Sequence, residues 1–197
     1  LAANEIGRGN LNKNEILEIA SEIEGHPDNV APALFGGMTA SVKDGNRVYF
    51  EKIKLPPGLK FCAIIPDFKL STKEARAVLP DSIPYKDGVY NVGRVSLLIA
   101  ALSNGNFEML KLACKDRLHE IYRGRLIGNY NEIVEECNRL NSLCVFLSGA
   151  GPTIMAVLKE EETDFSRHME EYLSKLECKW IIKELKSDHN GACVVNI

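Results

Sequence analysis

The sequence predicts an α+β fold, and three observations lead to that class. Amphipathic helices follow recognisable capping signals, and two strand-like runs flank a short turn at KDGN. After this hairpin, the predicted helices and strands follow the order β-α-β-β-α-β. The 197 residues are 45% hydrophobic, which is ample for a core. The chain should therefore fold as a globular protein.

The first strong element is a helix in NKNEILEIASEIEG, residues 12–25. Asn12 and Glu15 have the spacing of a capping box, and Gly25 is a typical stop signal. Apolar side chains recur at helical spacing at Ile16, Ile19, Ala20 and Ile23. This helix presents the polar string HPDN, residues 26–29, at its C-terminal end.

Two strand-like runs follow, GGMTASV and NRVYFEKIKL, with Asp44 and Gly45 as a hairpin signal between them. The sequence LPPG, residues 55–58, is the best candidate for a boundary. We therefore expect two domains, one over residues 1–56 and one over residues 57–197.

The second domain begins with the buried strand LKFCAIIP, after which Ser71 and Glu74 form another capping box. The further predicted helices are NVGRVSLLIAAL, NFEMLKLAC, NYNEIVEECNRL and TDFSRHMEEYLSKL. The further predicted strands are LCVFLS, TIMAVLK, CKWIIKEL and GACVVNI. This order is the ferredoxin-like plan, in which helices pack on an antiparallel sheet.

Charge and composition exclude several classes of protein. The chain has 24 basic and 27 acidic side chains without a basic stripe, so we expect no nucleic-acid partner. Its longest apolar runs, such as residues 95–102, are shorter than the ~20 residues of a membrane span. The six cysteines form no CxxC pair and predict buried, reduced thiols in a cytoplasmic protein. Their spacing does not favour a zinc site, because no two cysteines are as close in sequence as zinc ligands usually are.

One group of polar residues could bind a metal and a substrate. Glu18 lies on the first helix, and His26, Asp28 and Asn29 follow at the turn. Carboxylate oxygens suit Mg²⁺, and the other side chains could line a polar pocket. The alternative is that Pro27 and Asp28 simply begin the next short helix.

Two further features are weak by themselves. The sequence SGAGPT, residues 148–153, could approach phosphate oxygens through its backbone N–H groups, or could be a tight hairpin without a ligand. Arg76 and Arg123 could grip a carboxylate, although most helical arginines are solvated. His119, His168 and His189 lie in charged stretches and are expected at the surface.

Together, four motifs resemble the homoserine kinases of the GHMP small-molecule kinase superfamily. They are EGHPDNVAPALFGG, STKEARAVLP, YRGRLIGNY and LSGAGPTIMAVL, and their order and completeness carry the resemblance over essentially the whole chain. It implies the GHMP kinase fold, with the rest of a nucleotide domain followed by a ferredoxin-like domain. It also implies transfer of the ATP γ-phosphate to L-homoserine in threonine biosynthesis, with ATP and Mg²⁺ as cofactors.

The resemblance also assigns roles to residues. Glu18 resembles the magnesium ligand, while His26, Asn29, Thr72, Arg76 and Arg123 resemble residues around the substrate. The arginines would hold its carboxylate, and with Asp28 they are the catalytic candidates. Asp28 lies where related kinases carry a catalytic aspartate, the alternative being activation of the hydroxyl by the metal. Ser148, Gly149 and Gly151 would support the phosphate-binding loop.

One departure concerns that loop itself, because the family's serine-bearing phosphate loop would precede Leu1 and does not occur in the sequence. The chain also opens on LAANEI without an initiator Met. We therefore expect numbering that begins partway through a longer protein, and an incomplete enzyme if this chain is taken alone.

Two other functions stay open at this point. Another GHMP kinase, of the mevalonate or sugar type, would share Glu18 and SGAGPT without needing the arginine pair. A non-catalytic ferredoxin-like binding module would need neither ATP nor Mg²⁺. The family resemblance also leaves open a homodimer.

Overall fold

The computed structural model describes residues 1–195 and divides into two compact units, Leu1–Leu55 with the C-terminal segment from Ser187, and Pro56–Lys186. The first unit contains α1 (Ala2–Ile6), α2 (Lys13–Glu24), α3 (Val30–Phe35), β1 (Met38–Asp44) and β2 (Arg47–Ile53). The expected second domain runs to residue 197, whereas the structure packs residues 187–195 with the first unit.

Helix α2 has the predicted ends. The Asn12 side chain accepts hydrogen bonds from the N–H groups of Asn14 and Glu15, and Glu15 completes the capping box. The buried face is only partly the expected one: Ile16 is buried as predicted, but Ile19 and Ile23 are exposed, and Leu17 and Ser21 are buried instead.

Strands β1 and β2 form the predicted antiparallel hairpin, with Asp44 paired to Arg47 across the turn. Behind the hairpin, the rings of Phe35 and Phe50 stack with their centroids 4.2 Å apart. These rings join a small core that also contains Ile16, Leu17, Ala31 and Leu34.

The C-terminal segment packs on α3 and does not form the predicted final strand. In residues 191–195 no strand occurs, and residues 196–197 of that prediction lie outside the described chain. Ala192 N–H donates to Ala33 O, and a Cβ on Gly36 would lie 2.5 Å from Gly191 N. Gly36 also has φ +73°, a left-handed value that favours glycine, so close approach and conformation both require it.

The second unit is the predicted ferredoxin-like domain. Its four-stranded antiparallel sheet has the order β4-β5-β3-β6. The strands are β3 (Leu59–Pro66), β4 (Cys144–Leu147), β5 (Ile154–Lys159) and β6 (Trp180–Leu185). The helices are α4 (Thr72–Ala77), α5 (Tyr85–Ser103), α6 (Leu110–Ala113), α7 (Glu120–Arg123), α8 (Tyr130–Arg139) and α9 (Phe165–Leu173), with 3₁₀ turns at Phe107–Met109 and Gly124–Leu126.

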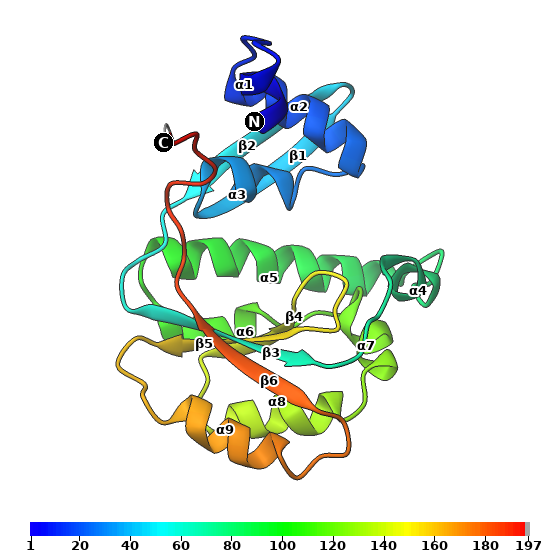
Figure 1. Ribbon diagram of the computed structural model, residues 1–197. Coiled ribbons are helices and arrows are strands. Elements are labelled where there is room, and N and C mark those ends of the chain that lie inside the picture. The colour runs from blue at the N-terminus through cyan, green and yellow to red at the C-terminus, as the bar shows by residue number, and fades with distance from the viewer. Residues whose placement is uncertain (196–197) are drawn as a thin grey trace. The chain divides into compact units, whose positions relative to one another are not determined.

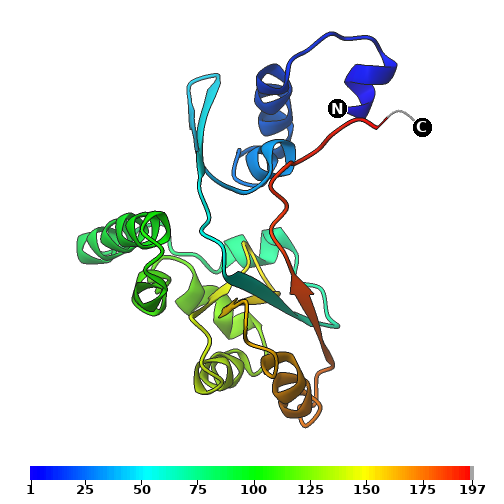
Figure 2. The same cartoon turned by 90° about the vertical axis from the view of Figure 1, so that its left-hand side faces the viewer.

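Helices α8 and α9 lie on the same side of this sheet (Figures 1 and 2). Their apolar faces and the facing strand residues form the main core, which includes Cys62, Ile64, Ile133, Cys137, Ile154, Leu158, Phe165 and Met169. Helix α6 instead contacts β4, the strand at one edge of the sheet. The connection from α6 to α7 therefore runs beside the end of β4.

The lengths of the helices and the burial of the cysteines bear on two expectations from composition. None of the helices within residues 1–195 combines the length and apolar character that crossing a bilayer requires. The expectation that the cysteines are buried holds for Cys62, Cys137 and Cys144, whereas Cys114 and Cys178 are partly exposed and Cys193 is exposed.

Candidate active site

The first group of candidate residues surrounds the C-terminal end of α2. Glu18 is half-buried on this helix, and its carboxylate makes no hydrogen bond or ion pair within residues 1–195. His26 follows α2 with a half-buried ring, whose Nδ1 lies 3.1 Å from Asp28 Oδ1 without forming an aligned hydrogen bond. The structure therefore places Glu18, His26 and Asp28 in one unit.

The alternative local interpretation of Asp28 also describes this segment in part. Helix α3 begins two residues later, at Val30, with Asn29 in the N-cap position. The Asn29 side chain nevertheless caps nothing, and both Asp28 and Asn29 are exposed. These polar groups remain accessible to a ligand.

The second group of candidate residues belongs to the ferredoxin-like unit and includes α4. Ser71 and Glu74 form the predicted capping box, in which the Ser71 hydroxyl accepts from Glu74 N–H at 3.1 Å. Thr72 and Arg76 are both exposed on the resulting helix. The cap therefore fixes the start of the element that carries both side chains.

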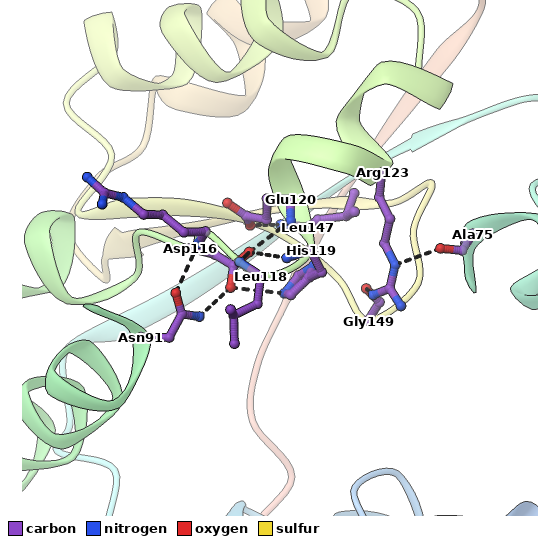
Figure 3. Close-up of polar contacts among 10 residues, drawn as sticks. Ala75, Asn91, Asp116, Leu118, His119, Glu120, Arg123, Leu147 and Gly149 are labelled. Atoms are coloured by element: carbon purple, nitrogen blue, oxygen red, sulfur yellow. Dashed lines mark hydrogen bonds and ion pairs between the residues drawn. The ribbon is translucent and has the colours of Figure 1, made fainter. Parts of the chain in front are cut away.

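Arg123, at the end of α7, joins α4 to the loop after β4. Its Nε donates to Ala75 O at 3.0 Å and its Nη1 donates to Gly149 O at 3.1 Å (Figure 3). Since a guanidinium has five N–H donors, three remain for a ligand. The group also reaches the backbone of Ala75, the residue before Arg76 in α4.

The SGAGPT loop is a tight turn between β4 and β5. Ser148 N–H donates to Thr153 O at 2.9 Å, and Gly151 N–H donates to Ser148 O at 3.0 Å. Gly151 has φ +85°, and a Cβ there would lie 3.1 Å from Leu147 Cδ1, so glycine is required. The hairpin interpretation is therefore right for the backbone, and Arg123 binds the loop at Gly149.

A partly buried polar network before α7 is not predicted from the sequence. Asp116 Oδ1 accepts from the backbone N–H groups of Leu118, His119 and Glu120, at 2.9, 2.6 and 2.8 Å. Its Oδ2 accepts from Asn91 Nδ2 of α5 at 2.5 Å. Asp116 thus ties the start of α7 to α5 (Figure 3).

The charge states of this network follow from burial and hydrogen bonding. Burial would raise the pKa of Asp116, but hydrogen bonds from His119 and Glu120 N–H and from Asn91 outweigh it and hold the pKa below its ordinary value. Burial lowers the pKa of His119, against the attraction of Asp116. His119 is only partly exposed, because its ring lies against Asp116, so the expectation of a surface position holds in part.

Glu120 is the most perturbed carboxyl group of the network. Burial raises its pKa to about 7, although the hydrogen bond from Leu147 N–H acts in the other direction. That bond joins Leu147 N to Glu120 Oε1 over 2.7 Å. A hydrogen-bonded carboxyl group with a raised pKa therefore lies three residues before Arg123.

Comparisons with known proteins show which sequences and folds this chain resembles. The family described as GHMP kinases C terminal matches residues 98–175. A homoserine kinase of Clostridium botulinum (strain 657 / Type Ba4) is 58% identical over 196 residues, which cover 100% of this chain and 66% of that protein. A homoserine kinase of Clostridium beijerinckii is 48% identical and covers 99% and 65%. The chain thus spans just under two thirds of the length of these relatives.

Solved structures show the same fold. A homoserine kinase from Cytophaga hutchinsonii superimposes with a TM-score of 0.87 at 24% identity, over 95% of this chain and 62% of that one. A mevalonate kinase from L. major gives a TM-score of 0.63 at 18% identity, over 97% and 63%. Those two likenesses show the fold alone, whereas the sequence identity to the clostridial proteins shows that the chain belongs to the homoserine kinase family within the GHMP kinases.

Proposed function

We propose that this protein transfers the γ-phosphate of ATP to the side-chain hydroxyl of L-homoserine. The hydroxyl oxygen forms a bond to the γ-phosphorus, the bond from that phosphorus to ADP breaks, and the hydroxyl proton is released. Such transfers depend mainly on positioning and charge neutralisation. The names and identity of the clostridial relatives support this choice of substrate.

The observation that carries the proposal is that two backbone hydrogen bonds fix the guanidinium of Arg123. Two of its donors are fixed on Ala75 O and Gly149 O, so its plane is set before substrate arrives. The remaining donors suit a carboxylate, and the neighbouring exposed Arg76 supplies a second cation. A substrate with an α-carboxylate, such as L-homoserine, fits this pair.

The remaining roles are assigned within each unit. In the second unit, Thr72 would bind the amino acid, and in the first unit His26 and Asn29 are assigned as further substrate-binding residues. Asp28 is exposed and carries a carboxylate that can take up the hydroxyl proton. Ser148, Gly149 and Gly151 would support the loop that binds the ATP phosphates.

Glu18 fits the part of a magnesium ligand. Mg²⁺ is commonly held by one or two carboxylates together with waters and substrate phosphates, so a three-residue protein cage is not needed. Residues 1–195 contain no such cage, and Glu18 offers an unpaired, half-buried carboxylate. When bound, Mg²⁺ would neutralise phosphate charge.

We also propose a cytoplasmic location, because all six cysteines are free thiols.

Glu18→Gln should raise the Mg²⁺ concentration for half-maximal activity by about 10-fold or more, since lost metal contacts typically cost at least that much. The measurement is a magnesium titration, repeated as Mg²⁺-dependent thermal stabilisation with ADP. Glu22→Gln, exposed one turn later on α2, is the control. Wild-type titrations for Glu18→Gln by both methods would exclude Glu18 as a ligand.

The proposed reaction is tested by ADP release with Mg-ATP, using the full-length product of the reading frame that encodes this chain. L-Homoserine, L-serine, mevalonate and galactose are offered separately. Turnover with homoserine alone supports the proposal, whereas turnover with mevalonate or galactose assigns a different GHMP activity. A folded protein that neither releases ADP nor gains thermal stability from ATP would instead be a binding module.

A further inference from the structure

Helix α7 is attached to the end of β4 and the following loop at two points. Glu120 Oε1 accepts the N–H of Leu147 at 2.7 Å, and Arg123 Nη1 donates to Gly149 O at 3.1 Å. The two side chains are three residues apart on the same helix, and Figure 3 shows their contacts on neighbouring parts of one segment. We call this pair of contacts the α7 clamp.

The helix needs such contacts because it is too short to hold its own orientation. It comprises only the four residues Glu120–Arg123 before the chain turns into a 3₁₀ segment at Gly124. An isolated turn of helix is unstable in water, so tertiary contacts must fix it. Asp116 holds its first N–H groups, and the clamp holds its body.

We infer that Glu120 is a positioning residue for substrate binding, because it fixes α7 against Leu147 and thereby sets where Arg123 presents its free donors. This role rests on the proposed function and adds a residue that does not itself touch homoserine. Arg123 also binds Ala75 O, so a shift of α7 would move Arg123 relative to Arg76. A carboxylate held by both arginines would sense that shift directly.

The chemistry of the clamp explains which side chains can replace Glu120. Leu147 is 3% exposed, so its N–H would lose its acceptor without easy access to water if the side chain were shortened. Glutamine retains an oxygen at the same distance along the chain, whereas aspartate is one methylene shorter. The clamp therefore depends on reach and an acceptor atom rather than on charge.

The test compares Glu120→Ala, Glu120→Asp and Glu120→Gln in the full-length product, with Glu135→Ala on the exposed face of α8 as the control. The alanine and aspartate variants should raise the KM for homoserine by about 10-fold, the usual effect of one lost hydrogen bond, with an unchanged KM for ATP. The glutamine variant should stay within about twofold of wild type on the same scale. A merely structural role would lower the folded fraction and hence kcat, leaving KM unchanged.

A second readout does not require activity. The Arg123 Nε–H signal in NMR spectra should exchange slowly in wild type and in Glu120→Gln, and faster in the alanine and aspartate variants. If the alanine variant does not fold, the aspartate variant carries the comparison. Wild-type protein without homoserine turnover would overturn the proposed function alone. Unchanged Nε–H exchange in the folded variants, or an unchanged homoserine KM in an active enzyme, would overturn the positioning role.

Discussion

Replacing Arg123 by alanine is expected to raise the KM for L-homoserine by about 100-fold, and replacing Arg76 by about 30-fold, with the KM for ATP nearly unchanged. Hydrogen bonds to charged groups contribute about 1.5–3 kcal/mol, which corresponds to losses of this size. The larger effect is expected for Arg123 because that variant also loses the bonds to Ala75 O and Gly149 O. Steady-state kinetics with each substrate varied in turn measure both constants.

Arg125→Ala is the matched control for these variants. Arg125 is exposed, lies two residues after Arg123, and makes no hydrogen bond or ion pair in the described chain. Its homoserine KM should equal that of wild type. A homoserine KM that does not change in either Arg76→Ala or Arg123→Ala would remove the carboxylate-binding role from that residue.

Replacing Glu120 by glutamine is expected to remove a pH-dependent loss of about 3 kcal/mol from the free energy of unfolding. Burial raises the pKa of Glu120 in the folded protein to about 7 from 4.5, so the native state binds the proton more tightly than the unfolded chain. The contribution of Glu120 to the free energy of unfolding therefore falls as pH rises from 4.5 to about 7. Glutamine has no charge to bury, so the variant should become more stable relative to wild type between pH 4 and pH 8.

The measurement is urea unfolding followed by fluorescence of Trp180, which is the one tryptophan and packs against the core of the ferredoxin-like unit. Comparing variant with wild type at each pH isolates Glu120 from its titratable neighbours Asp116, Cys114, Cys144 and Tyr130. Glu136→Gln is the control of opposite sign, because the hydrogen bond to Arg139 lowers the pKa of Glu136. A stability difference for Glu120→Gln that is independent of pH would contradict the burial argument.

The features that the sequence predicts correctly are those with local causes. Asn12 with Glu15, and Ser71 with Glu74, mark two helix starts because each cap joins residues three apart. Gly45 marks the hairpin for a similar reason, since the turn needs a left-handed residue between paired strands. The strand order followed from hydrophobic patterns and gave the ferredoxin-like sheet.

The features that it misses depend on residues far apart in the chain. Residues 187–195 pack with the first unit, where Gly36 and Gly191 lie in close contact, and neither neighbourhood signals the other in the sequence. The pair formed by Glu120 and Leu147 spans 27 positions, and DRLHE resembles an ordinary charged surface stretch. Only Asp116 left a local signal, because an aspartate just before a helix commonly accepts its first N–H groups.

The most direct test of the account compares L-homoserine with 3-aminopropan-1-ol, which has the same hydroxyl and amine but lacks the carboxylate. We expect kcat/KM for the wild-type full-length product to be at least about 100-fold higher for homoserine, given the contribution of charged hydrogen bonds. Arg123→Ala should lose most of that preference, because its kcat/KM should fall for homoserine and stay unchanged for 3-aminopropan-1-ol. Equal kcat/KM values for the two alcohols in wild type would contradict the account, because the carboxylate would then contribute nothing through the arginine pair.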